Sequence, residues 1–167
     1  MNIGQAINDR GEATMNSLML DGSTHAFVVV NGVPQDLGTY PSDAFLTVTP
    51  CCNTINNKGQ IVGLSIDSSF NQRALLWQSK DQAPVDLNTL VPADSPWYLL
   101  IPSGITDSGE IAVTAMNVNT LELHAVVLTP IEGGRAARGD MKPPKLPLSV
   151  LKRLQNSLGR LSLPSAQ

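Results

Sequence analysis

The stretch "INDRGEA" at residues 7–13 has the residue types for chemistry, because it places Asp9 and Glu12 on either side of Gly11. Two nearby carboxylates can act as a general acid and a general base, and clustered oxygen ligands bind cations such as Ca²⁺. The same spacing also suits a tight turn, since Asn and Asp side chains bond the local backbone and Gly adopts positive φ. Near-copies elsewhere in the chain help to choose among these hypotheses.

Two further copies of the stretch occur, "INNKGQI" at residues 55–61 and "ITDSGEI" at residues 105–111. In the middle copy an amide replaces each acid, so both charges are lost. An amide carries neither the negative charge nor the proton that metal binding or acid catalysis needs. The pattern therefore predicts a repeated structural turn with no catalytic residue and no metal site. The turn residues are Asn8, Asp9, Gly11, Asn56, Asn57, Gly59, Asp107 and Gly109.

Other markers repeat at the same step. The turn glycines are 48 and 50 residues apart, and the segments that begin at His25, Arg73 and His124 are 48 and 51 apart. The segments "DLGTY" and "DLNTL" are again 50 apart. A step near 50 residues is typical of propeller blades. No Gly-x-Ser-x-Gly or His-Glu-x-x-His motif accompanies the histidines, so we interpret these three residues as strand-start residues that bond a neighbouring blade.

The segments between the turns read as strands. The runs "HAFVVV", "RALLW" and "HAVVL" are continuously apolar, which is typical of strands covered on both faces. We therefore expect an all-β fold of propeller-like blades, with about three four-stranded units at residues 1–40, 41–90 and 91–130. Propellers close with about four to eight blades, so the ring would be incomplete or completed by an oligomer. Upstream blades or a second copy of the chain are the expected partners.

The last part of the chain differs in composition. Residues 1–130 carry twelve acidic and four basic side chains, whereas residues 131–167 carry two acidic and seven basic ones. We expect a flexible basic linker at 131–147, an amphipathic helix at 148–162 with leucines on one face, and a disordered end at 163–167. The helix would dock on the sheet or on a second copy, or remain disordered. Membrane binding is not favoured, and nucleic acid is not expected because no aromatic residue lies among the basic ones.

A few residues outside the repeats attract attention. Trp97 and Tyr98 lie in a proline-flanked segment and are candidates for stacking on a sugar ring or another ligand. The adjacent cysteines Cys51 and Cys52 are expected to be small buried residues on opposite faces of a strand, since a bond between neighbours is strained. The start of the chain shows no secretory signal pattern. Nothing in the sequence indicates a cofactor.

The repeated motifs resemble a known family. The segments "AINDRGE", "HAFVVVNGVPQDLGT", "INNKGQIVG", "RALLW", "DLNTLVP", "GITDSGEIAV" and "HAVVLTP" resemble the HAF repeat family of probable extracellular bacterial proteins. The resemblance covers roughly residues 2–130 and implies a secreted or surface-exposed, propeller-like repeat protein of which this chain forms the last three repeats. It implies no reaction, because the family has no established catalytic residues.

We therefore expect a non-catalytic extracellular repeat module with a structural role or a role in binding a carbohydrate or protein ligand. The alternative is a carbohydrate-acting hydrolase that uses acids such as Asp107 and Glu110 in the mouth of a ring. Such an enzyme would bring two carboxyl groups to about 5 to 9.5 Å from each other in a cleft. A third hypothesis is an orphaned fragment of a longer repeat protein.

Overall fold

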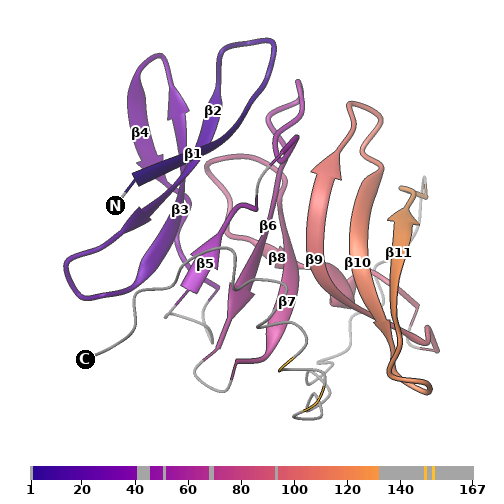
Figure 1. Ribbon diagram of the computed structural model, residues 1–167. Coiled ribbons are helices and arrows are strands. Elements are labelled where there is room, and N and C mark those ends of the chain that lie inside the picture. The colour runs from indigo at the N-terminus through magenta and orange to yellow at the C-terminus, as the bar shows by residue number, and fades with distance from the viewer. Residues whose placement is uncertain are drawn as a thin grey trace.

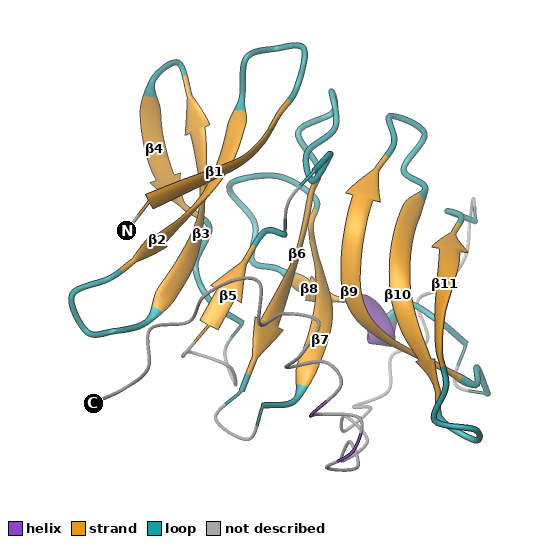
Figure 2. Cartoon of the chain, in the orientation of Figure 1, coloured by secondary structure: helices purple, strands orange, loops and turns teal. Residues whose placement is uncertain are grey.

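A computed structural model describes residues 2–40, 46–50, 52–67, 70–92 and 94–131, together with residues 149 and 152. These residues form a mostly β structure (Figure 2). The strands are β1 (Asn2–Ile7), β2 (Ala13–Leu18), β3 (Thr24–Val30), β4 (Val33–Asp36), β5 (Leu46–Val48), β6 (Ile61–Ile66), β7 (Gln72–Trp77), β8 (Val85–Asp86), β9 (Trp97–Ile105), β10 (Ile111–Asn117) and β11 (Leu123–Leu128). One short 3-10 helix, η1 (Leu87–Thr89), follows β8.

The strands fall into three antiparallel groups that lie side by side (Figure 1). We call β1–β4 the first unit, β5–β8 the middle unit and β9–β11 the third unit. A parallel pairing of Thr24 with Leu46 joins the first and middle units into one eight-stranded sheet, and the third unit is a separate sheet. The all-β expectation is confirmed. Neither sheet closes on itself, so no propeller ring is shown.

The third unit has three strands in the described residues, where about four were expected. In the first unit the Asn31-Gly32 turn, with φ of 52° and 78°, returns the chain into β4. Two consecutive positive φ angles suit the right-handed twist of a tight hairpin. In the third unit Pro130 follows β11 almost at once, and proline has no N–H to donate to a neighbouring strand.

The middle unit forms the centre of the core. Every residue of β6 and β7 is buried, which agrees with the two-sided burial expected for residues 73–77. One face of this unit packs on the first unit, through a cluster that includes Val28, Ile61 and Trp77. The other packs on the third unit, through a cluster that includes Val62 and Val113. The run at 124–128 was also expected to be covered on both faces, but β11 is an edge strand and is largely exposed.

Side-chain amides also join neighbouring units by imitating a strand backbone. Asn16 of β2 donates to the carbonyl of Thr49 over 2.7 Å and accepts from its N–H over 2.8 Å. Asn88 of η1 does the same with Leu99 of β9, over 3.0 and 2.7 Å. Each amide satisfies a backbone donor and acceptor that the junction between units would otherwise leave unpaired.

The expectation for the cysteines is wrong for Cys52, and Cys51 lies outside the described residues. Cys52 is exposed and has a φ of 74°, which a strand does not allow. The chain bends there on its way from β5 to β6, so strand geometry and burial are both lost.

The basic tail lies almost wholly outside the described residues. The linker beyond residue 131, the disordered end and the helix expected at 148–162 are not described, apart from residues 149 and 152, and the structure gives the helix no support. Among the described residues, no helix has the length and apolar character needed to cross a membrane.

The packing of the middle unit can be tested at Gly63. A Cβ added there would lie 2.6 Å from the Val48 carbonyl oxygen and 2.8 Å from Trp77. We expect Gly63→Ala to lower the free energy of unfolding by about 1–3 kcal/mol, since a packed core does not yield to an added methyl group. Urea unfolding measures this. The control is Gly4→Ala in β1, where no atom lies within 4 Å and the change should be small; equal effects would contradict the packing.

Candidate functional site

The repeated turns close by the same local hydrogen bonds. In the first turn, the Gly11 N–H donates to the Asn8 carbonyl over 3.0 Å. Asn8 Oδ1 accepts from the backbone N–H groups of Arg10 and Glu12, over 3.1 and 2.9 Å. Gly11 has a φ of 76°, which glycine adopts without strain. The conserved order of residue types within the motif therefore serves the turn itself.

The other two turns follow this pattern with one difference. Asn56 Oδ1 accepts from the N–H groups of Lys58 and Gln60, both over 3.0 Å. Thr106 takes the place of the asparagine in the third turn, and its Oγ1 accepts from the Glu110 N–H over 3.0 Å. A hydroxyl thus replaces the amide oxygen as acceptor, but it brings no amide nitrogen.

The three turns also bond to one another, although their sequence positions are about fifty residues apart. Asn8 Nδ2 donates to the Asn56 carbonyl over 3.0 Å, and Asn56 Nδ2 donates to the Thr106 carbonyl over 2.9 Å. Each asparagine therefore shapes its own turn with its oxygen and holds the next turn with its nitrogen. We call the six residues Asn8, Asp9, Asn56, Asn57, Thr106 and Asp107 the turn ladder.

The second residue of each turn adds another row of bonds to the turn ladder. The Asp9 N–H donates to Asn57 Oδ1 over 2.9 Å, and the Asn57 N–H donates to Asp107 Oδ1 over 2.7 Å. Asn57 Nδ2 lies between the two acids and donates to Oδ2 of both, over 2.8 and 3.0 Å. The amide in the middle copy thus separates two carboxylates that would otherwise repel each other.

The turn ladder lines a polar groove at one end of the units. Asn56 is buried, with 3% of its surface exposed, whereas Asp107 is exposed. Hydrogen bonds from the Asn57 backbone N–H and side chain lower the pKa of Asp107, with a further contribution from Lys58 and a partial offset from desolvation. A general acid needs a carboxyl group that stays protonated, which is the opposite shift.

The acids named in the hydrolase alternative take part in turn bonding instead. Asp107 accepts from Asn57, and Glu110 accepts from the Ser108 hydroxyl over 3.2 Å. Asp9 and Asp107 do approach each other, since each is one hydrogen bond from the same Asn57 nitrogen. That nitrogen therefore lies between the two carboxylates and is bonded to both.

His25 and Arg73, which were expected to bond a neighbouring blade, each contact an aspartate of their own unit. His25 Nδ1 lies 2.8 Å from Asp36 Oδ2, and Arg73 Nη1 lies 3.1 Å from Asp86 Oδ2. Each pair ties the third strand of a unit to the end of its fourth strand. Sequence reasoning missed the aspartates as partners, although "DLGTY" and "DLNTL" repeat in step with the basic residues. Arg73 also lies 4.8 Å from the ring of Tyr40.

His124 is exposed, and no fourth strand in the described residues supplies it with an equivalent aspartate. Its Nε2 lies 3.7 Å from Glu122, and its ring packs edge-on against Trp97 with centroids 5.1 Å apart. The expected ligand residues Trp97 and Tyr98 begin β9 and do not lie in a loop. Tyr98 is 2% exposed, so its ring offers no surface for stacking. Trp97 is half-buried against the third unit's core.

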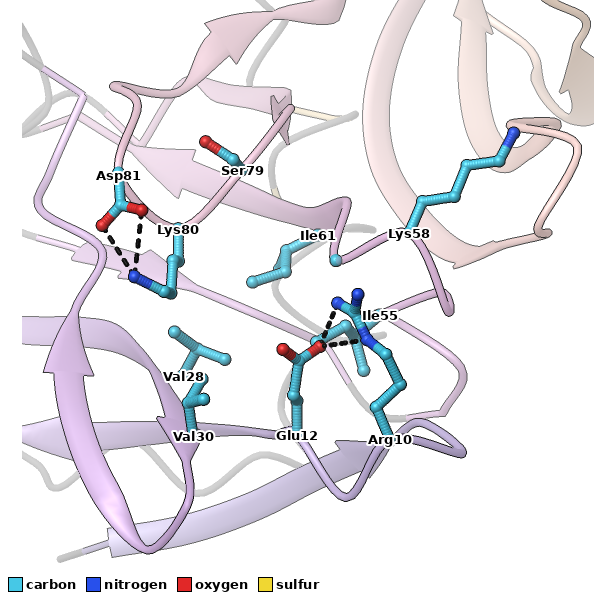
Figure 3. Close-up of a pocket in the computed structure, with 11 residues that line it drawn as sticks. Arg10, Glu12, Val28, Val30, Ile55, Lys58, Ile61, Ser79, Lys80 and Asp81 are labelled. Carbon is cyan, nitrogen blue, oxygen red and sulfur yellow. Dashed lines mark hydrogen bonds and ion pairs between the residues drawn. The ribbon is translucent and has the colours of Figure 1, made fainter.

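A small pocket opens between the first and middle units (Figure 3). Its floor is apolar, and its rim carries two ion pairs, Arg10 with Glu12 and Lys80 with Asp81. Figure 3 shows Lys58 pointing away from the other rim residues. The volume is about 160 Å³, well below the roughly 300–1,000 Å³ typical of ligand pockets. The pocket is small, and the charged residues at its rim already pair with each other. These features do not favour a ligand site.

The described residues contain no cluster of three or more His, Cys, Asp or Glu side chains able to hold a metal ion. The features that bear on function are therefore the turn ladder and the exposed outer faces of the two terminal units.

Comparison with protein families decides the relationship of the chain. Residues 1–135 match the model of DUF3466, described as a protein of unknown function. The chain belongs to the DUF3466 family. The resemblance to the HAF repeat family is therefore wrong, and the extracellular location that only this resemblance implied loses its basis. No curated protein and no solved structure matches the chain.

We call the bonds of Asn8, Asn56 and Thr106 the inner row of the turn ladder, and those of Asp9, Asn57 and Asp107 the outer row. The inner row predicts a large effect of Asn56→Ala. The change removes the nitrogen that holds Thr106 and the oxygen that caps the turn, at a site only 3% exposed. We expect a loss of about 2–4 kcal/mol in the free energy of unfolding, because buried backbone groups are left unpaired. The matched control is Asn57→Ala in the outer row, where water can replace the lost bonds and the cost should be under about 1 kcal/mol. A smaller effect at Asn56 than at Asn57 would contradict the assignment.

The outer row predicts a pH dependence. Because the folded-state pKa of Asp107 is lowered, its contribution to stability is present above the unfolded pKa of about 3.9 and is lost as the pH falls through the lower folded value. Asp107→Asn should therefore cost stability at pH 6 and cost less at pH 3. Urea unfolding of both proteins at the two pH values measures this difference. A cost that is the same at both values would show that the bonds to the carboxylate do not matter.

Proposed function

We propose that this chain is a non-catalytic β-repeat module that binds a protein partner through the outer faces of its terminal units. The observation that carries the proposal is the difference in burial between the units. β6 and β7 are buried throughout, whereas each terminal unit has a neighbouring unit on one side only within the part of the chain that the structure describes. Interior β-units normally bury both faces, so a terminal face is where a further protein surface can be added.

Exposed apolar residues mark both outer faces. Ile7 at the end of β1 is 69% exposed, and Val127 on the edge strand β11 is 66% exposed. Large apolar side chains that remain in water near an unpaired sheet face are typical of protein interaction sites. A ring of blades completed by a partner remains one form that such binding could take.

The hydrolase alternative has less support. Its two acids are engaged in turn bonds, the pKa of Asp107 is lowered, and an amide lies between the acids that do approach each other. Binding of carbohydrate is also weakly supported, since Tyr98 is buried and Trp97 packs against His124. A protein partner requires none of these groups.

Site-specific photo-crosslinking in the native host tests the proposal. A photoreactive, apolar residue placed at Ile7 or Val127 should yield discrete crosslinked species that contain another protein. The control position is Leu20, which lies in the turn after β2 and is fully exposed. If Ile7 and Val127 give nothing, or give the same adducts as Leu20, the proposal is wrong. Hydrolysis of a glycoside panel that is lost in Asp107→Asn would instead support the hydrolase.

A further inference from the structure

The turn ladder has a direction. At both junctions the first residue of the earlier turn donates its side-chain nitrogen to the carbonyl of the later turn, from Asn8 to Asn56 and from Asn56 to Thr106. One further bond runs the other way, from Asn57 Nδ2 to Asp9 Oδ2. The backbone N–H groups of Asp9 and Asn57 likewise donate to the side chain of the following turn. The two ends of the turn ladder are therefore chemically different, with acceptors at the first turn and donors at the third.

The acceptor end is open. In the second and third turns, the first residue's carbonyl accepts from its own glycine and also from the preceding asparagine. The Asn8 carbonyl accepts from Gly11 alone among the described residues. Asp9 Oδ1 corresponds to the oxygens through which Asn57 and Asp107 accept from a preceding turn, and it accepts no bond from any described residue. Two acceptors are thus positioned for a preceding turn.

The apolar contact beside the turn ladder is open at the same end. Ile7, Ile55 and Ile105 each come immediately before a turn in the repeated motif. Ile55 and Ile105 are each 2% exposed, because each packs in a cluster shared with the preceding unit. Ile7 is 69% exposed. The face of the first unit therefore continues the pattern of the two observed junctions, and no described unit covers it.

The donor end is closed by a change of residue type. Thr106 stands where the other two turns have asparagine, so no amide nitrogen can reach a following carbonyl. Its hydroxyl instead bonds Ser108 Oγ over 2.8 Å and accepts from the Glu110 N–H. The third unit therefore terminates the ladder, whereas the first unit can extend it.

We propose that the open face of the first unit docks a further β-unit whose turn has the sequence Asn-Asn-x-Gly. The proposal rests on the proposed function and names the partner's chemistry. The junction from Asn57 to Asp107 is the observed case in which an aspartate is the following residue, and there the preceding turn supplies asparagine. Asp9 likewise requires an amide before it.

A second copy of this chain is a poor occupant of that face. Its third unit would bring Thr106, which lacks the amide donor, and Asp107, whose carboxylate would lie next to that of Asp9. Two adjacent carboxylates repel each other, so the native chain should not stack on itself through this end.

A gain of association tests the proposal. The double variant Thr106→Asn with Asp107→Asn gives the third unit an Asn-Asn-Ser-Gly turn, so that each copy carries the partner's chemistry. We expect its mass, measured by light scattering after gel filtration, to at least double as the concentration rises, while the native chain stays monomeric. The matched control adds Asp9→Ala, which removes the side-chain acceptor and should weaken the association at least tenfold.

Each other outcome would overturn the proposal. A folded double variant that stays monomeric would show that the open face does not bind an Asn-Asn-x-Gly turn. Native self-association that is lost in Asp9→Ala would make a second copy the occupant. Should the double variant not fold, Asp107→Asn alone removes the acid that would face Asp9 and is measured against Asp107→Glu, with association, weaker than that of the double variant, expected only for asparagine. Crosslinks from Ile7 without association of these variants would reject this inference but not protein binding.

Discussion

The structure depends on the asparagine that opens the first and the middle turn, because this one side chain performs two tasks. Its oxygen caps the backbone N–H groups of its own turn, and its nitrogen holds the carbonyl of the next turn. Local folding and assembly of the units are therefore coupled through a single residue. Loss of the asparagine from the first or the middle turn would remove the cap of that turn and the bond to the next turn together, whereas Thr106 of the third turn caps its own turn and brings no amide nitrogen.

The same coupling accounts for the acids in the turns, which serve as hydrogen-bond acceptors. An acid within a turn is useful as an acceptor for a neighbouring N–H, and an amide between two acids removes their repulsion. The alternation of Asp9, Asn57 and Asp107 follows from this requirement. Charge is placed here to orient the backbone, so the exchange of acid for amide in the middle copy preserves the function of the position.

The sequence indicates the strands and the repeat well because both depend on local patterns. The turn glycines have the positive φ that the motif requires, and the apolar run at residues 73–77 is buried on both faces. Contacts between strands and between units could not be read in the same way. The pairing of His25 with Asp36 spans two strands, and the exposure of β11 depends on which unit stands next to it. The family assignment failed for a related physical reason. Asx-x-x-Gly turns followed by short apolar strands solve a common backbone problem, so such motifs can resemble those of a family to which the chain does not belong.

The contrast among Ile7, Ile55 and Ile105 shows how a repeat sequence can carry information about assembly. The same residue type at the same place in the motif is buried twice and exposed once. A position selected only for the fold of its own unit would tolerate a polar residue wherever it faced water. Isoleucine at the exposed copy lies next to two acceptors that take no bond from a preceding turn among the described residues, and this fits a surface that is covered when the protein performs its function. Position 106 shows the opposite case, since the motif has threonine instead of asparagine in the last unit that the structure describes.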